Sequence, residues 1–511
     1  MSVVPECTDA VTDTADGELE QILAAAAVAA DDWEARSPRE RARVLVALGD
    51  ALRAGADALI DVAARETGLP DARLRGEIAR TDLQLKMFAE ELVAGRFLDV
   101  VLDEHDADFA LGPRPDLRRY RVPVGPVLVF AASNFPFAFS VAGTDTASAL
   151  SAGCPVVLKA HPGHPRTSAM TAEIVTSTLA REGAPPGTFA MISGVDAGVR
   201  ALRDPRIAAA AFTGSVPGGR ALFDIAAARR CPIPFYGELG SLNPAIVTPN
   251  AAETRGDDIA TGFAGSFTLG AGQFCTKPGL LLVPAGSPVV TRIAELTADV
   301  PAARLLTRGI ADGFRRRLAD MTAVDGVEVL VDGAEHGGAD AVSSYGPSLL
   351  RVSTRTLLAH ADVLLEEAFG PTALIAEYAS TDEVLDVLAR LDGALTVTVH
   401  TPDTLDGTER DDVRRVVRVA ARKAGRLVFN GWPTGVAVTP AQNHGGPYPA
   451  TTAVAHTSVG TAAMTRFLRP LAYQDAPAEV LPDALRDSNP MSLPRATNAA
   501  GESRSWGRLS P

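Results

Sequence analysis

The chain has 511 residues, of which 46% are hydrophobic and 22% charged, and its formal net charge is −14 at pH 7. These values exclude a disordered protein and predict two to four globular domains. The acidic balance argues against nucleic acid or an anionic membrane as the main partner. The N-terminus lacks the apolar core of a signal peptide, and no later apolar run is long enough to span a bilayer. We therefore expect a cytoplasmic protein with no membrane partner.

Cysteine and histidine usage gives no sign of a metal site. The four cysteines are Cys7, Cys154, Cys231 and Cys275. They form no CxxC pair and no Cys/His ligand spacing, so we expect neither a disulfide framework nor a bound metal. The eight histidines are scattered, and we expect them to be surface or core residues.

The N-terminal part of the chain predicts helices followed by strands. Residues 17–97 are rich in Ala, Leu, Arg and Glu, with apolar residues three and four positions apart, which is typical of amphipathic helices. Ser37 is followed three residues later by Glu40, a pattern that predicts a helix start. Residues 99–124 are mixed polar and predict strands or a hairpin.

From Val127 onward, short apolar strands alternate with helices. The expected strands are VLVFAAS, PVVLKA, FAMISG and IAAAAFTGS, and after Gly240 NPAIVTP, GLLLVPAG, VEVLVDG, TALIAEY, ALTVTVH and RLVFN. This alternation predicts parallel βαβ units and an α/β fold. The tail after about residue 487 is rich in Ser, Pro, Arg and Gly, and we expect it to be loose.

The segment GAGQFCTKPG contains a candidate nucleophile, Cys275, in a turn-rich setting. A thiolate is the reactive form of cysteine, and nearby positive charge or backbone N–H groups lower the thiol pKa. Lys277, two positions on, is a candidate for such a charge. The alternative is a buried structural cysteine, which suits Cys154 and Cys231 better because each precedes a proline and an apolar run.

Two further segments offer polar groups that could act in catalysis. In YGELGSLNP, Glu238 is either a solvated surface charge or a site residue, since Leu239 and Gly240 after it would let backbone approach a ligand closely. In FAASNFPFAFS, Asn134 follows a buried strand among three phenylalanines. It is either a turn-forming residue or a donor aimed at a developing charge.

A glycine-rich turn, FTGSVPGG, lies between an expected strand and an expected helix. Such a turn can bind an anion at the helix N-terminus. Taken alone the motif is weak, because strand, glycine turn and helix follow one another in many proteins.

Taken together, these segments identify a family. Asn134, Glu238 and Cys275 occur in the order and approximate spacing of the aldehyde dehydrogenase superfamily, along with Lys159, the glycine turn and EEAFGP (residues 366–371). The resemblance extends from about residue 18 to residue 490. The segments PFAFSVAGTDTASALSAGCPVVLKAHPGHP and FNGWPTGVAVTP are similar to the 2-oxoglutarate semialdehyde (2,5-dioxovalerate) dehydrogenase branch, which is close to NADP-dependent fatty aldehyde dehydrogenases.

The resemblance implies a role for each catalytic candidate. Cys275 would attack the aldehyde carbon, and the oxyanion would lie between the Asn134 side-chain amide and the Cys275 backbone N–H. Hydride would pass to a nicotinamide, leaving a thioester that Glu238 hydrolyses by activating water. The glutamate argues against an acylating enzyme that passes the thioester to coenzyme A. The intact trio argues against a non-catalytic protein on the same fold.

The resemblance also implies a cofactor site and a substrate pocket. The cofactor residues would be Lys159 for the ribose hydroxyls, Gly214, Ser215 and Gly219 for the pyrophosphate, Leu239 and Gly240 for the nicotinamide, and Glu367 and Phe369 for its ribose. Pro162 occupies the position where NAD-preferring relatives have a glutamate, so NADP is expected, with NAD possible. His161, Arg200 and Arg203 are candidates for the 2′-phosphate.

The expected pocket lining is strongly apolar: Phe135, Phe139 and Phe274. It suits a medium- or long-chain or aromatic aldehyde, whereas the branch points to a small keto-acid semialdehyde. An acidic substrate needs an Arg or Lys clamp, and spacing alone places none.

The domain organisation follows from the same resemblance. We expect a Rossmann-like cofactor domain, an α/β catalytic domain, a small β oligomerisation flap that builds a homodimer or homotetramer, and a loose tail. Their ranges are 1–104 with 124–239, 240–460, 105–123 with 461–490, and 491–511.

Overall fold

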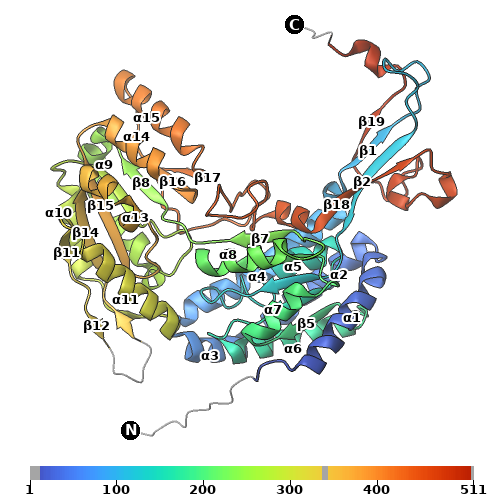
Figure 1. Cartoon of the computed structure of the whole chain (residues 1–511), viewed down its shortest axis with the longest axis horizontal. Helices are drawn as coiled ribbons and strands as arrows, with labels where there is room; N and C mark the ends of the chain where they lie inside the picture. Colours follow the sequence, from blue (N-terminus) through green and yellow to red (C-terminus); the bar gives the residue numbers. More distant parts are fainter. Residues whose placement is uncertain (1–11, 337–342, 508–511) are drawn as a thin grey trace.

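The computed structural model describes residues 12–336 and 343–507, so Cys7 lies outside the described residues. Two α/β bodies lie side by side, and a narrow sheet extends from one of them (Figure 1). Within the described residues, no helix is long and apolar enough to cross a membrane.

The chain begins with the predicted run of amphipathic helices. They are α1 (Asp16–Glu34), α2 (Pro38–Ala54), α3 (Ala56–Thr67) and α4 (Asp71–Ala94). The predicted start of α2 is confirmed, because the Ser37 side chain accepts from Glu40 N–H while the Glu40 carboxylate accepts from Ser37 N–H. Helices α2 and α4 pack against each other, and α2 packs against the connecting helices α5 (Thr144–Ala152) and α6 (Pro165–Arg181) of the first sheet, with which they share one hydrophobic core.

The first sheet is fully parallel, with strand order β5-β4-β3-β6-β7. Its strands are β3 (Val127–Phe130), β4 (Val156–Lys159), β5 (Phe189–Ile192), β6 (Ala209–Thr213) and β7 (Phe235–Glu238). The connecting helices are α5 (Thr144–Ala152), α6 (Pro165–Arg181), α7 (Val195–Arg203) and α8 (Val216–Ala227). All four residues of β3 are buried, which explains its continuous apolar sequence.

The strand order reverses at β3, which pairs with β4 on one side and β6 on the other. Ligands of open parallel sheets bind beyond the carboxyl ends of the strands at such a switch point. Asn134, Lys159, Gly214 and Glu238 lie at the carboxyl ends of β3, β4, β6 and β7.

The second sheet has seven strands in the order β11-β14-β15-β9-β8-β16-β17, all parallel except β11. Its strands are β8 (Pro244–Val247), β9 (Leu280–Pro284), β11 (Glu328–Val331), β14 (Ser348–Ser353), β15 (Thr372–Tyr378), β16 (Ala394–His400) and β17 (Ala424–Phe429). The helices are α9 (Pro249–Thr268), α10 (Val289–Ala298), α11 (Arg308–Thr322), α12 (Thr354–Ala359), α13 (Ala361–Leu364), α14 (Thr381–Arg390) and α15 (Gly407–Ala420). Separate apolar cores cover its two faces.

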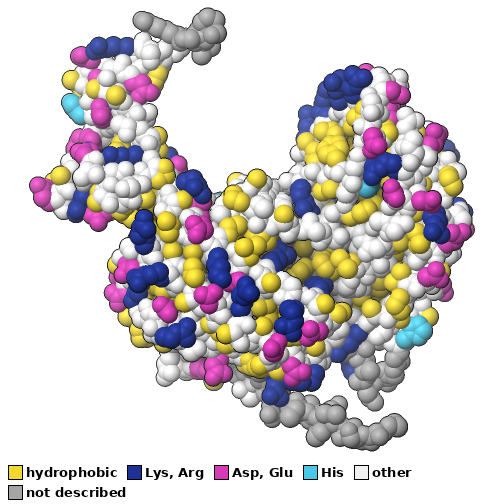
Figure 2. Space-filling model, turned by 180° about the vertical axis from the view of Figure 1, so that it is seen from behind, with side chains coloured by type: hydrophobic (Ala, Val, Ile, Leu, Met, Phe, Trp, Pro, Cys, Tyr) yellow, Lys and Arg dark blue, Asp and Glu magenta, His cyan; other side chains and the backbone are white. Residues whose placement is uncertain are grey.

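The projecting arm is a four-stranded sheet in the order β18-β2-β1-β19. Its strands are β1 (Val100–Asp103), β2 (Leu117–Pro123), β18 (Leu468–Gln474) and β19 (Arg495–Asn498). The space-filling view shows the arm standing away from the body (Figure 2).

The expectation of a loose tail after residue 490 is wrong for residues 495–498. Strand β19 pairs in parallel with β1, and the Asn498 side chain donates to Asp103 over 2.6 Å. Arg114 also donates to the carbonyls of Asn498 and Ala499. Strand pairing uses main-chain groups, so a polar Ser/Arg composition does not prevent it.

Candidate active site

The buried side-chain amide of Asn243 helps to fix the loop that carries Cys275. Cys275 lies between a short 3₁₀ helix (η2, Leu269–Gly272) and β9. The Asn243 side chain donates to the carbonyl of Cys275 over 2.8 Å and to that of Lys277 over 3.1 Å. Its oxygen accepts from the backbone N–H of Thr396. Hydrogen bonds therefore connect the nucleophile loop to the amino-terminal ends of strands β8 and β16 of the second sheet.

The approach to Cys275 needs left-handed backbone. Gly270, Ala271 and Gly272 have φ values of 58°, 56° and 66°. Such values favour glycine and cost free energy at alanine. A Cβ on Gly272 would overlap the carbonyl of Gly370, so the loop approaches the neighbouring segment through that glycine.

Lys277 does not provide the positive charge that its position near Cys275 suggested. Its ammonium is 2% exposed and donates to the carbonyls of Ala368, Gly370 and Thr372. Burial lowers the pKa of Lys277 to about 8. Its role is to hold the segment 368–372 against the nucleophile loop.

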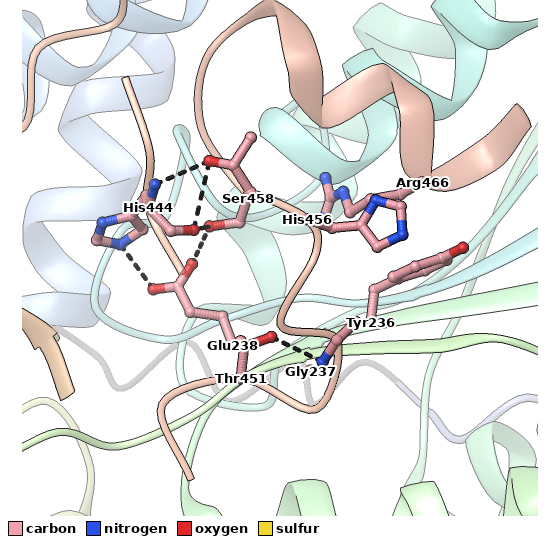
Figure 3. A pocket seen from close by; sticks show the side chains of 10 residues that line it. Tyr236, Gly237, Glu238, His444, Thr451, His456, Ser458 and Arg466 are labelled. Atoms are coloured by element: carbon pink, nitrogen blue, oxygen red, sulfur yellow. Dashed lines mark hydrogen bonds and ion pairs between the residues drawn. The ribbon is translucent and has the colours of Figure 1, made fainter. Parts of the chain in front are cut away.

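Cys275, His444 and Glu238 form a connected trio. His444 Nε2 lies 3.4 Å from the Cys275 Sγ and 2.8 Å from a Glu238 oxygen. The second Glu238 oxygen accepts from the Ser458 hydroxyl, and the Thr457 hydroxyl accepts from the His444 backbone N–H. Figure 3 shows the Glu238, His444 and Ser458 side chains pointing toward one another. Glu238 is 4% exposed, so it is no surface charge.

His444 is the site residue that sequence reasoning missed. We expected the histidines to be surface or core residues, and His444 is buried but makes contact with both reactive groups. The available signal was its place in the segment HGGPYPATT (residues 444–452), where two glycines and two prolines indicate a constrained loop.

The electrostatics of the trio set its resting protonation. Burial raises the pKa of the Cys275 thiol well above its usual value, and the charge of Glu238 raises it further. Burial would also raise the pKa of Glu238, but His444, Ser458 and Cys275 outweigh it and lower that pKa overall. The resting site therefore holds a neutral thiol beside an ionised carboxylate. A carboxylate only accepts hydrogen bonds, so His444 Nε2 carries the hydrogen in the contact with Glu238.

The loop after β3 brings Asn134 to the nucleophile loop. The Asn134 side-chain amide donates to the carbonyl of Gln273 over 3.0 Å, two residues before Cys275. Arg73 donates to the Asn134 carbonyl over 2.8 Å. Glu77 accepts from the backbone N–H groups of Phe137 and Ala138. Helix α4 thus positions the loop.

The three phenylalanines expected in the pocket do come together. Phe135 lies edge-to-face with both Phe139 and Phe274, with ring centroids 5.3 Å apart in each pair. They pack with Val459, and the partly buried Val436 and Val438 lie against the cluster.

The expected cofactor residues fall into two groups. The first group lies at the carboxyl ends of β4 and β6: Lys159 is the last residue of β4, and Gly214, Ser215 and Gly219 follow β6. Ser215 caps α8 by accepting from Gly218 N–H, and a Cβ on Gly219 would overlap the Leu239 side chain.

The second group is Leu239, Gly240, Glu367 and Phe369, near the start of the second sheet. A Cβ on Gly240 would overlap a Glu367 oxygen, and Phe369 is partly buried. The other Glu367 oxygen is buried and has no hydrogen-bond partner among the described residues. Burial raises the pKa of Glu367 to about 7.

Of the three candidates for the 2′-phosphate, His161 is the weakest. Burial lowers its pKa to about 3, so it is neutral near pH 7, and its Nδ1 accepts from Gly163 N–H. Arg200 and Arg203 lie on α7, where Gly198 packs against Lys159. Arg200 forms an exposed ion pair with Asp16 over 2.6 Å.

The remaining cysteines are free thiols in different settings. Cys154 is buried, as expected of a structural residue, whereas Cys231 is exposed, which makes its interpretation as a buried structural cysteine wrong. Cys231 lies in the turn that links α8 to β7 rather than in the apolar strand after it. The ligand atoms of Cys275, Glu238 and His444 lie within 4.8 Å of one another, a grouping that could also hold a metal ion.

Comparison with known proteins adds the final evidence. The model of the aldehyde dehydrogenase family matches residues 5–448. Alpha-ketoglutaric semialdehyde dehydrogenase 2 of Azospirillum brasilense is 44% identical over 493 residues, covering 96% of this chain and 92% of the relative. Alpha-ketoglutaric semialdehyde dehydrogenase of Acinetobacter baylyi is 39% identical over 484 residues, covering 94% and 91%.

Solved structures agree with the α/β architecture predicted from the sequence. Lactaldehyde dehydrogenase from Escherichia coli superposes with a TM-score of 0.77 at 21% identity, covering 91% of this chain and 92% of that one. The NADP-dependent glyceraldehyde-3-phosphate dehydrogenase from Bacillus halodurans, complexed with NADP, gives 0.74 at 21% identity, covering 90% and 92%. At this identity the likeness shows the fold.

Proposed function

The chain belongs to the aldehyde dehydrogenase family, and we propose that it oxidises a semialdehyde of the 2-oxoglutarate semialdehyde type with NADP, through a thioester on Cys275. The observation that carries the proposal is the contact of one buried histidine, His444, with both the thiol of Cys275 and the carboxylate of Glu238. A nucleophile and a base within reach of each other are what covalent catalysis at a carbonyl requires.

The first step creates the nucleophile. Because the pKa of Cys275 is raised, the thiol must give up its proton as the aldehyde binds. The ionised carboxylate of Glu238 lies within 4.8 Å of Sγ and is held there by the His444 Nε2–H and the Ser458 hydroxyl, so it can accept that proton. Because the pKa of Glu238 is lowered, the carboxyl passes the proton on to solvent before hydrolysis. The His444 Nε2–H, whose nitrogen is 3.4 Å from Sγ, can donate to the thiolate.

The second step is attack on the aldehyde carbon. The Asn134 amide, held by the loop that Arg73 and Glu77 fix, donates to the developing oxyanion together with the Cys275 backbone N–H. A bound nicotinamide would supply the acceptor for the hydride that leaves the substrate carbon. The product of this step is the Cys275 thioester.

The last step is hydrolysis of the thioester. Glu238 is ionised because its pKa is lowered, so it can take a proton from water. A cavity of about 10 Å³ adjoins Glu238, His444 and Ser458, close to the size of one water site. The presence of this carboxylate favours hydrolysis over transfer to coenzyme A.

The residues around the strand ends fit a dinucleotide. The α8 N-terminus, capped by Ser215, suits a pyrophosphate. The buried Glu367 oxygen, which has no hydrogen-bond partner in the part of the chain that the structure describes, suits a ribose hydroxyl. Pro162 leaves no carboxylate to repel a 2′-phosphate, which favours NADP, and α7 offers Arg200 for it. In this arrangement the first sheet binds the cofactor and the second carries the nucleophile.

We assign oligomerisation to the arm. Strands β18 and β19 are the outer strands of its sheet, and β17 is an outer strand of the second sheet. A second copy can cover such edges by strand addition. The arm projects from the body, which leaves its sheet accessible to a second copy of the chain and fits a homodimer or homotetramer assembled through the arm (Figure 1).

The relatives support the substrate class, while the aromatic pocket keeps medium- and long-chain aldehydes as the second candidate. The deciding experiment compares kcat/KM of the purified enzyme for 2-oxoglutarate semialdehyde, succinic semialdehyde and a medium-chain aldehyde, each with NADP and NAD. We expect the first substrate with NADP to give the highest value. Cys275→Ala should abolish turnover while NADP still binds, and substantial turnover by this variant would overturn the mechanism.

A further inference from the structure

Three charged residues share the face of α4 that contacts the aromatic cluster of Phe135, Phe139 and Phe274, where we expect the substrate pocket. Arg73, Glu77 and Arg80 are spaced four and three residues apart, so they lie on one side of the helix. Arg73 and Arg80 both place their guanidinium groups over the pocket phenylalanines. A substrate chain that enters among those rings therefore meets this helix face.

Two of the three residues are engaged by the protein itself. Arg73 lies between the rings of Phe135 and Phe274, 4.6 and 4.5 Å from their centroids, and donates to the Asn134 carbonyl. Glu77 accepts from two backbone N–H groups of the Asn134 loop. These contacts fix the loop.

Arg80 differs from both. Its guanidinium lies 5.3 Å from the Phe139 centroid and 5.8 Å from that of Phe135. Its Nε and one Nη are buried, and neither has a hydrogen-bond partner within residues 12–336 and 343–507. A buried guanidinium without an acceptor is costly, so this group calls for an explanation.

Other arginines near the site do not offer donors in the same way. Arg426 uses both of its Nη atoms on the carbonyls of Pro433 and Gly435, which leaves only its Nε without a partner among the described residues and so no free two-donor fork. Arg466 is paired with the buried Asp145 over 2.7 Å. Arg80 also lies close enough to Cys275 and Glu238 for their charges to act on it.

We propose that Arg80 binds the carboxylate of the substrate and so determines specificity for an acidic semialdehyde. This inference rests on the proposed function, because it names how that site selects its substrate. The guanidinium presents two adjacent N–H donors, the fork that a carboxylate accepts in bidentate fashion. The phenylalanine rings then enclose the methylene groups, which reconciles an apolar pocket with an acidic substrate.

The test compares Arg80→Gln with the wild type on two aldehydes of equal length, 2-oxoglutarate semialdehyde and pentanal. We expect kcat/KM for the semialdehyde to fall about 100-fold, mainly through KM, because a buried charged hydrogen-bond pair is lost. The kcat/KM of Arg80→Gln for pentanal should stay within about threefold of the wild-type value. Product inhibition by 2-oxoglutarate, measured with pentanal as substrate, should weaken in parallel.

Two further variants separate recognition from folding. Arg75→Gln removes the same charge from the exposed side of α4, where Arg75 pairs with Asp57 and Asp71. This variant should leave kcat/KM unchanged for both aldehydes. Arg80→Lys keeps the charge without the fork and should restore part of the loss. It also serves as the test if the glutamine variant does not fold.

The outcomes distinguish the two proposals. If the wild type prefers pentanal, the substrate class is wrong and the role of Arg80 fails with it. If the wild type prefers the semialdehyde but Arg80→Gln loses both activities by the same factor, or keeps its preference, the proposed function stands and Arg80 is not the clamp.

Discussion

His444 contacts Glu238 through a 2.8 Å hydrogen bond although 206 residues separate them in the chain. Cys275 lies 3.4 Å from the same ring nitrogen. The histidine therefore links nucleophile and carboxylate, and the state of either group depends on the other. This coupling makes the trio testable residue by residue.

Replacement of His444 by asparagine should slow formation of the thioester. The thiol of Cys275 has a raised pKa. Without the imidazole, Glu238 loses the hydrogen bond that lowers its pKa and holds it near the thiol, and Sγ loses a neighbouring N–H donor. We expect the single-turnover rate of NADPH formation to fall about 100-fold or more, because the general base is no longer held in position. Rapid-mixing measurements at 340 nm would show this.

His456 provides the matched control. It is partly buried in the same loop region, with its ring 5.2 Å from that of Tyr236. Among the described residues it forms no hydrogen bond or ion pair with Cys275, His444 or Glu238. His456→Asn should retain the wild-type single-turnover rate. If His444→Asn does so as well, the histidine has no part in activating the thiol.

Replacement of Glu238 by glutamine should separate hydride transfer from hydrolysis. The variant keeps Cys275 and His444, so it should form about one NADPH per active site in a burst. The following steady rate should be about 100-fold or more below that of the wild type, because no carboxylate activates water. A lower steady rate without a burst contradicts the assignment of Glu238 as the hydrolytic base.

Ser458 should control the pH dependence of the reaction through Glu238. Its hydroxyl donates to the carboxylate and helps to lower the pKa of Glu238. Hydrolysis needs the ionised form, so activity is lost as the pH falls through that pKa. In Ser458→Ala the pKa rises, and the acid limb of the steady-state profile should move to higher pH.

The control for this shift is Ser458→Thr, which retains a hydroxyl and should keep the acid limb near its wild-type position. The basic limb should not differ among the three proteins. An acid limb that stays in place in Ser458→Ala shows that the hydroxyl does not tune the carboxylate.

The same grouping predicts inhibition by zinc. A thiolate, an imidazole and a carboxylate with ligand atoms within 4.8 Å of one another suit tetrahedral Zn²⁺. We expect Zn²⁺ to abolish activity by capturing the nucleophile, EDTA to reverse the effect, and EDTA alone to leave the rate unchanged. Loss of activity with EDTA alone would instead indicate that a metal takes part in the reaction.

Sequence reasoning found the residues that follow directly from strand ends. Asn134 and Glu238 come just after or at the end of buried strands of the first sheet, where side chains of separate strands meet. The apolar pattern of the strands predicted where their carboxyl ends lie, and the glycines around Cys275 indicated a constrained loop. Family resemblance supplied their roles.

Other residues could not be predicted because only tertiary structure gives them meaning. His444 lies in an irregular loop with no periodic pattern, 169 residues from Cys275. In the sequence, Arg80 is one of many charged residues on an amphipathic helix, and only the structure shows that it lies over an aromatic ring of the site. Strand β19 was missed because its pairing with β1 depends on main-chain groups rather than on an apolar sequence.

Pro162→Glu should change the cofactor preference of the enzyme. Position 162 is three residues beyond Lys159, which ends β4, and a carboxylate there accepts from the ribose hydroxyls of NAD but repels a 2′-phosphate. We expect kcat/KM with NADP to fall about tenfold or more while that with NAD rises.

Arg200→Gln should weaken the binding of NADP but not that of NAD, because it removes a positive charge on α7 without adding an acceptor for the ribose hydroxyls. Fluorescence titration of both cofactors against both variants checks this directly, and equal losses for NAD and NADP would show that neither position reads the 2′-phosphate.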